Sequence, residues 1–176
     1  MRKIAVTAVI LISAACLYAQ ENQRDISYHD MSRPFFFAAP SVEAVWYGRT
    51  PPSIGYGFAL GSEGNVFIGT ASIGLKGIYA VPLAEDDLTT LEVTIFFRIY
   101  MPWADTADGF FAQLTYGFAL FSWDGRIQLL AESGMISLGV TAGWRFPLGS
   151  RFFIEPYIRA GYPYYGGAGL STGIRF

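Results

Sequence analysis

Bulky apolar residues alternate with small residues along short stretches of this chain, and no other feature constrains its fold as strongly. In the last ten residues, GAGLSTGIRF, one parity carries Ala168, Leu170, Thr172, Ile174 and Phe176, and the other carries glycine, serine and arginine. Successive side chains of a β-strand point to opposite faces. The stretch is therefore predicted to be a strand with one bulky face and one small face.

The same two-faced pattern recurs between turn signals along the chain. Segments rich in β-branched and aromatic residues, bounded by Gly, Pro, Asn and Asp, predict eight strands. We expect them at about 36–48, 53–61, 66–82, 88–101, 110–122, 134–147, 151–163 and 167–176. The expected connectors include 49–52, 61–65, 84–87, 103–109 and 147–150. Two further stretches, 34–40 and 127–131, leave ten strands as an alternative.

The first nineteen residues have the pattern of a secretory signal. A short basic head precedes an apolar run from Ile4 to Tyr18, and Ala19 offers a small residue for cleavage. A second interpretation makes Cys16 a lipidated N-terminus, because the residues before it loosely resemble a lipobox. Residues 20–34 are polar and aperiodic and are predicted to be a periplasmic lead-in. One domain is then expected over residues 35–176.

The composition is unusual for a soluble exported domain. Hydrophobic residues make up 52% of the chain and charged residues only 15%, where about 25% charged is usual. After the signal, no apolar run approaches the roughly 18 residues that a membrane helix needs. A hydrophobic exported chain without helical spans leaves the closed transmembrane β-barrel as the common solution. A formal net charge of −2 gives no reason to expect nucleic acid as a partner.

Alternation alone does not say which face is wet, but residue size does. Eight strands enclose just enough room for ordinary side chains to fill, so bulky apolar faces turned inward would overpack the lumen. We therefore predict an all-β, antiparallel, up-and-down transmembrane barrel with bulky residues on lipid and small residues inside. With both termini periplasmic, the connectors at 49–52, 84–87, 121–133 and 163–166 lie outside.

The hairpin around residue 149 supports the same orientation. A three-residue loop at 148–150 puts Arg145 on the face of Glu155 and Arg159, whereas a two-residue turn would put Arg145 on the lipid face. Charge near the bilayer midplane costs roughly 2–4 kcal/mol for Arg or Lys, so the three-residue loop is predicted. Pro156 cannot donate to a ladder, and we expect a local bulge there.

Two sets of residues follow from this barrel. Polar residues on the small faces predict a lumen network, which either fills the interior as salt bridges or forms a gate or narrow polar pore; its members are Lys76, Glu92, Arg98, Gln113, Arg145, Glu155, Arg159 and Arg175. Aromatic residues near strand ends are predicted to lie at the two membrane interfaces; these are Trp46, Tyr47, Tyr100, Trp103, Trp144, Phe146, Tyr162, Tyr164 and Tyr165.

The residues give little support for catalysis. The histidine of the chain, His29, lies in the lead-in, which disfavours a Ser-His-acid triad on the barrel wall. Removal of the signal removes the one cysteine, so neither a thiolate nucleophile nor a zinc-thiolate site is expected. We predict no enzyme activity, no cofactor and no metal.

The signal, the eight alternating strands and the terminal aromatic residue resemble the small Gram-negative outer-membrane barrels of the OmpA and OmpX type. The resemblance implies the outer membrane as location and its lipid as surroundings. It also implies that periplasmic chaperones and the barrel assembly machinery act during biogenesis, the latter reading Leu170, Ile174 and Phe176 on the last strand. Three functions stay open: a plugged barrel in envelope structure or surface interaction, a channel for small solutes or hydrophobic molecules, and a soluble lipocalin-like carrier.

Overall fold

The structure is a computed structural model that describes residues 35–47, 52–66, 69–83, 89–100, 108–123, 126–127 and 134–176. Nine strands are assigned within these ranges. They are β1 (Phe35–Trp46), β2 (Ser53–Val66), β3 (Gly69–Pro82), β4 (Thr89–Tyr100), β5 (Gly109–Trp123), β6 (Arg126–Ile127), β7 (Gly134–Leu148), β8 (Phe152–Tyr162) and β9 (Gly166–Arg175). The expected signal, the lead-in with His29, and Trp103 lie outside the described residues.

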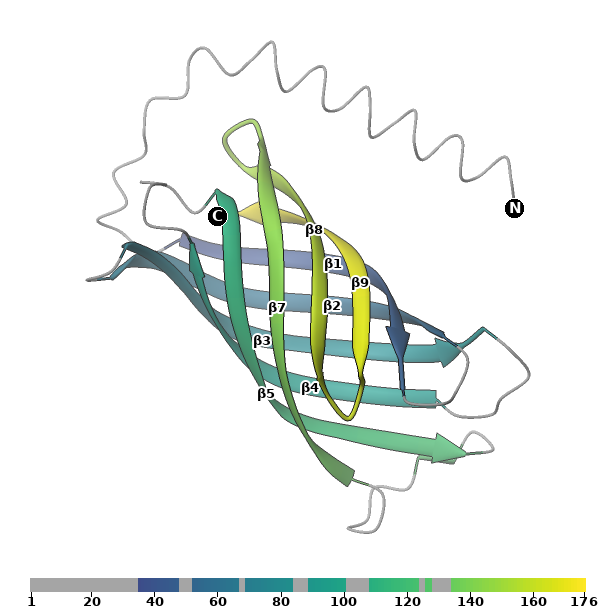
Figure 1. The fold of residues 1–176 in the computed structure, drawn as a ribbon. Helices are drawn as coiled ribbons and strands as arrows, with labels where there is room; N and C mark the ends of the chain where they lie inside the picture. Colours follow the sequence, from purple (N-terminus) through teal and green to yellow (C-terminus); the bar gives the residue numbers. More distant parts are fainter. Residues whose placement is uncertain are drawn as a thin grey trace, which may run out of the picture.

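Eight of these strands form a closed antiparallel barrel (Figure 1). Each long strand pairs with the next long strand along the chain, and β9 returns to pair with β1. The two-residue β6 pairs only with the end of β5, where Ser122 faces Ile127. The predicted fold class is therefore confirmed, and the described wall has eight strands and not ten. No helix in the described ranges is long and apolar enough to cross a membrane.

The two faces of the wall differ as the alternation predicts. Along β4, Val93 and Ile95 are about half exposed on the outside, whereas Glu92, Thr94 and Phe96 are buried inside. The other strands repeat this division, so large apolar side chains cover the outer surface. The interior holds charged residues, hydroxyls and aromatic rings.

Inward glycines make room for those aromatic rings. A Cβ atom on Gly169 would lie 2.5 Å from Cζ of Tyr157, and one on Gly61 would lie 2.6 Å from Cε1 of Phe37. Gly173 faces the ring of Phe153 even more closely. Because packed interiors tolerate no such overlap, the glycine face is the counterpart of the rings that fill the lumen.

The expected connector Gly61–Asn65 is wrong, because these residues belong to β2. The strand continues to Val66, which pairs with Gly69 at the start of β3. Glycine and polar residues suggested a turn, but in the structure Gly61 accommodates an aromatic ring and Glu63 is a buried interior residue.

The β7–β8 hairpin has a three-residue loop, as predicted, but the loop is shifted by one residue along the chain. Leu148 pairs with Phe152, so the loop consists of residues 149–151, and Gly149 has a φ of 75°. The predicted bulge at Pro156 is wrong. The registers Phe146↔Ile154 and Gly143↔Tyr157 are the same on both sides of the proline, so its missing N–H interrupts the ladder without inserting a residue.

Candidate functional site

The charged side chains of the interior gather in two clusters, and the first lies toward the end of the barrel that carries the last residue of β9. Arg145 of β7 bridges Glu63 of β2 and Glu155 of β8. Arg98 of β4 makes a second contact with Glu155, 2.6 Å from Nη1 to Oε1. Two arginines and two glutamates, each from a different strand, are therefore joined by ion pairs.

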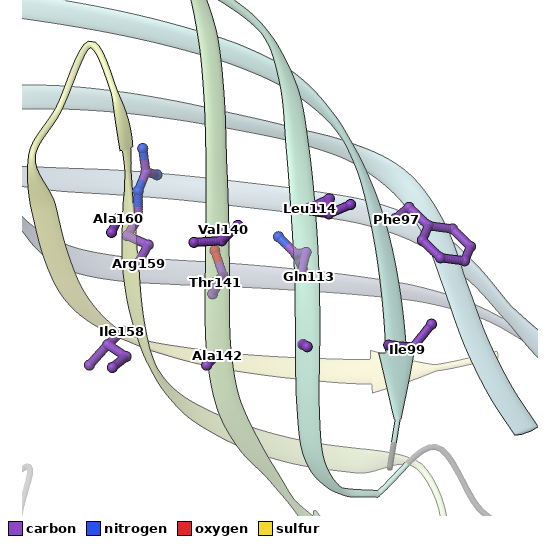
Figure 2. A pocket seen from close by; sticks show the side chains of 11 residues that line it. Phe97, Ile99, Gln113, Leu114, Val140, Thr141, Ala142, Ile158, Arg159 and Ala160 are labelled. Carbon is purple, nitrogen blue, oxygen red and sulfur yellow. The ribbon is translucent and has the colours of Figure 1, made fainter. Parts of the chain in front are cut away.

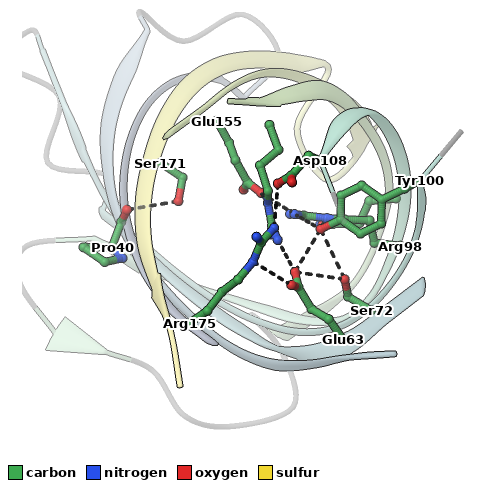
Figure 3. Close-up of polar contacts among 11 residues, drawn as sticks. Pro40, Glu63, Ser72, Arg98, Tyr100, Asp108, Glu155, Ser171 and Arg175 are labelled. Atoms are coloured by element: carbon green, nitrogen blue, oxygen red, sulfur yellow. Dashed lines mark hydrogen bonds and ion pairs between the residues drawn. The ribbon is translucent and has the colours of Figure 1, made fainter. Parts of the chain in front are cut away.

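Arg175, the last residue of β9, joins Asp108 to this first cluster (Figure 3). Its Nε donates to Oε2 of Glu63 at 3.1 Å, and its Nη2 donates to Oδ1 of Asp108 at 2.7 Å. The hydroxyl of Tyr100 donates to Glu63 at 3.0 Å. Because Ser72 also donates to it at 3.4 Å, Glu63 accepts bonds from four side chains, and it is only 1% exposed.

Arg145 is the most enclosed member of the cluster, with no exposed surface. Its guanidinium carbon lies 3.9 Å from the ring centroid of Phe153, and the rings of Phe37 and Tyr100 lie 5.3 and 5.2 Å away. An arginine over aromatic faces gains cation–π attraction that grows when the pair is desolvated. Rings and carboxylates together fix this side chain.

The second cluster lies further along the interior and is built around Arg159 of β8. Its Nη1 lies 3.0 Å from Oε1 of Glu43, and its Nη2 lies 2.5 Å from Oε2 of Glu92. Lys76 of β3 lies 3.6 Å from Oε2 of the same Glu43. The hydroxyl of Tyr157 donates to Glu43 at 3.0 Å and accepts from Lys76 at 3.2 Å.

Each cluster balances its own charge. The first joins three carboxylates to three guanidinium groups, and the second joins two carboxylates to one guanidinium and one ammonium. A buried ion is tolerated when its charge is paired and its hydrogen-bonding capacity is met. The arrangement is therefore that of a charge-paired ionic core, in which the buried Nε of Arg159 has no hydrogen-bond partner among the described residues.

A small cavity lies inside the lumen, lined by members of both clusters, among them Lys76, Arg98 and Glu155. Its volume is about 20 Å³, which is room for about one water molecule. Interior side chains fill the space around it.

The structure places all of the predicted lumen residues on the interior side of the wall. Seven of them are at least nine-tenths buried, and Arg175 is partly buried. Gln113 is joined to the first cluster, because its Oε1 accepts from Nε of Arg98 at 2.9 Å. Sequence reasoning missed Glu43 and Glu63, although Glu43 shares its parity with the inward Ser41 and could have been found from the alternation.

The expected interfacial aromatics divide into two groups. Trp46, Trp144, Phe146, Tyr162 and Tyr165 are exposed on the outside. The prediction is wrong for Tyr47, Tyr100 and Tyr164, which are buried in the interior. Position near a strand end suggested an interface, but the side on which a residue projects depends on parity.

In the turn after β8, burial raises the pKa of the Tyr164 phenol, so it stays neutral beside Arg159.

Leu170 and Ile174 lie on the outer face of β9, where Leu170 is 38% exposed, and Phe176, 70% exposed, follows the strand directly. Within the described ranges, no three His, Cys, Asp or Glu side chains are grouped so that they could hold a metal ion. The interior carboxylates described above already accept bonds from cationic side chains. The geometry thus pairs these charges with one another.

A closed ring of eight antiparallel strands with an apolar outside and an ionic inside is the fold of the small outer-membrane β-barrels. The chain is similar to the N-terminal β-barrel domain of Pseudomonas aeruginosa OprF, with a TM-score of 0.50 and 13% identity over 81% of this chain and 97% of that one. It is also similar to Neisserial surface protein A, with a TM-score of 0.53 and 12% identity over 81% and 95%.

Both similar structures are outer-membrane barrels of eight strands. At these identities the likeness shows the fold alone. No protein-family model matches the sequence, and no curated protein matches it.

Proposed function

We propose that the protein is an integral barrel of the outer membrane, exported with a cleaved signal, and that it serves envelope structure or surface interaction without enzymatic activity. We also propose that its lumen is closed to solutes. Outer-membrane lipid, and the chaperones and assembly machinery that insert barrels, are the partners that belong to this proposal.

The apolar outer wall carries the proposal. Large side chains such as Leu138, Val140 and Ile158 are between 54% and 65% exposed. Monomeric soluble proteins rarely expose contiguous apolar patches larger than a few hundred Å². Hydrocarbon satisfies such a wall and water does not, which argues against a soluble carrier.

The charge-paired interior supports a closed lumen. A solute passing through the barrel would have to displace Arg145 or Arg159 from their carboxylates, and each of these arginines bridges two. Separating buried ion pairs is strongly unfavourable. The described cavity, lined by members of both clusters, has room for about one water molecule.

Fractionation tests the membrane part of the proposal. We expect the protein in the sarkosyl-insoluble envelope fraction, with a migration on detergent gels that changes on heating, because a closed barrel resists detergent until it is boiled. Full extraction into aqueous buffer without detergent would overturn the proposal in favour of a soluble carrier.

Single-channel recording tests the closed lumen. Barrels reconstituted in planar bilayers are expected to show no stable conductance. Glu155→Ala removes a carboxylate shared by Arg98 and Arg145, and should lower stability without producing regular channel steps. Discrete conductance in the unaltered protein would favour the channel instead.

A further inference from the structure

The outer wall carries a concavity that the interior clusters do not explain. A groove of about 350 Å³ crosses β4, β5, β7 and β8 (Figure 2). The side chains that line it from the outside are apolar, and they include Phe97, Ala112, Leu114, Val140, Ala142 and Ile158. Gln113, Thr141 and Arg159 also border it but are buried in the interior, so the groove presents hydrocarbon to its surroundings.

Strand register explains why a groove forms at this place. Ala112 pairs with Ala142 across β5 and β7, and the next outward pair on these strands is Leu114 with Val140. Residues two apart on a strand share a face. Two adjacent methyl groups therefore lie beside two larger side chains, with Ile99 and Ile158 at either end of the alanine pair, and the wall is indented at the alanines.

Aromatic rings border the other side of the alanine pair. Phe110 pairs with Trp144, two residues closer to the barrel end than the alanines, and their ring centroids lie 6.4 Å apart. Phe146 lies next to Trp144 at 6.2 Å. Amphipathic rings favour the membrane interface. The groove thus leads from an interfacial aromatic cluster into the apolar wall.

We propose that this groove binds one acyl chain of a membrane phospholipid, whose headgroup lies at the level of Trp144. The inference rests on the proposed function, which places this wall in a bilayer. The volume falls in the range of roughly 300–1,000 Å³ typical of sites for single small molecules. Because no outward polar group lines the groove, the occupant is hydrocarbon and the headgroup stays outside it.

Photocrosslinking in vesicles tests the proposal. The purified chain is reconstituted in phosphatidylethanolamine–phosphatidylglycerol vesicles that contain a trace of phospholipid with a diazirine on its acyl chain. After illumination, mass spectrometry maps the adducts. Residues 110–114 and 140–144 are expected to carry about threefold more adducts per outward residue than β1 to β3, the ratio produced by a preference of roughly RT.

A matched pair of variants makes the test specific. The double substitution Ala112→Leu and Ala142→Leu fills the groove and should abolish the excess at these segments. The double substitution Ala44→Leu and Ala168→Leu adds the same bulk to a cross-strand pair of outward alanines on β1 and β9, away from the groove, and should leave the excess unchanged.

The other outcomes separate this proposal from the proposed function. Uniform adducts around a correctly folded barrel would overturn the groove and leave the membrane location intact. Absence of lipid adducts from every strand would overturn the membrane location itself. Crosslinks between two protein copies at the groove, increasing with protein density, would show that a second copy occupies it and would overturn the lipid proposal.

Discussion

At the scale of single residues, the interior depends on arginines that each hold two carboxylates from different strands. Arg145 joins Glu63 to Glu155, and Arg159 joins Glu43 to Glu92. Without its arginine, each pair of glutamates would be two like charges in a space with little water. The arginine therefore allows these carboxylates to be buried at all.

Removal of Arg145 should be among the most damaging single substitutions in the barrel. Arg145→Met leaves two buried carboxylates without their shared partner, and breaking a buried pair in this way costs about 3–5 kcal/mol. Urea unfolding of the reconstituted barrel, followed by tryptophan fluorescence, measures the loss. Arg151→Met is the matched control, because Arg151 is exposed in the β7–β8 loop. Equal stability of the two variants would contradict this account.

The packing of rings against glycine gives a second prediction. A Cβ on Gly173 would collide with the ring of Phe153, and overpacking of this kind costs typically about 1–3 kcal/mol. Gly173→Ala should lower the free energy of unfolding in the same urea assay, and Phe153→Leu added to it should recover part of the loss. Gly77→Ala serves as control, since its Cβ would meet nothing closer than 4.0 Å. If both alanines have the same effect, ring contact is not the cause.

At the scale of elements, period-two alternation made the faces of the strands predictable, because it is a local property of the chain. Glu155 and Arg159 lie four residues apart on β8 and both project inward, as their parity requires. The partners were not predictable in the same way. Whether Glu63 reaches Arg145 depends on the registers of every strand between β2 and β7, and the parity of one strand contains no information about those registers.

Composition was misleading where one residue type serves two purposes. Glycine at position 61 predicts a turn because glycine is common in turns, yet its role is to leave space for Phe37. The place of Tyr100 at a strand end predicts an interface, yet its hydroxyl donates to Glu63. In both cases the deciding fact is a contact with a residue distant in sequence.

The β7–β8 loop gives a prediction at the same scale. Gly149 has a φ of 75°, a region that costs other L-residues roughly 1–2 kcal/mol. Gly149→Val is expected to slow folding into lipid vesicles and to destabilise the hairpin, whereas Gly149→Asn should be tolerated, since asparagine adopts this conformation more readily. The heat-dependent gel shift measures the folded fraction over time. Equal folding by the two variants would show that the loop conformation is not limiting.

At the scale of the whole molecule, the proposed bilayer location predicts that the cost of a charged substitution on the outer wall depends on its depth, which would not hold for a soluble protein. Ile95→Arg places a charge in the middle of β4, where the bilayer penalty is about 2–4 kcal/mol, falling to about 0–1 near the interfaces. Phe36→Arg, near the start of β1, is the shallow control. Unfolding from vesicles should show a large loss for the first variant and a small one for the second. Similar losses would argue that this wall does not face a bilayer.

The two ionic clusters have a practical consequence for the design of pores. Each of the described ion pairs lies within one cluster, and each cluster is neutral by itself. Substitutions at sites without shared partners tend to add in their effects on stability. Small neutral side chains could therefore replace the charged residues of one cluster while the other cluster continues to block the lumen. The product would be a barrel with a water-filled cavity open at one end only.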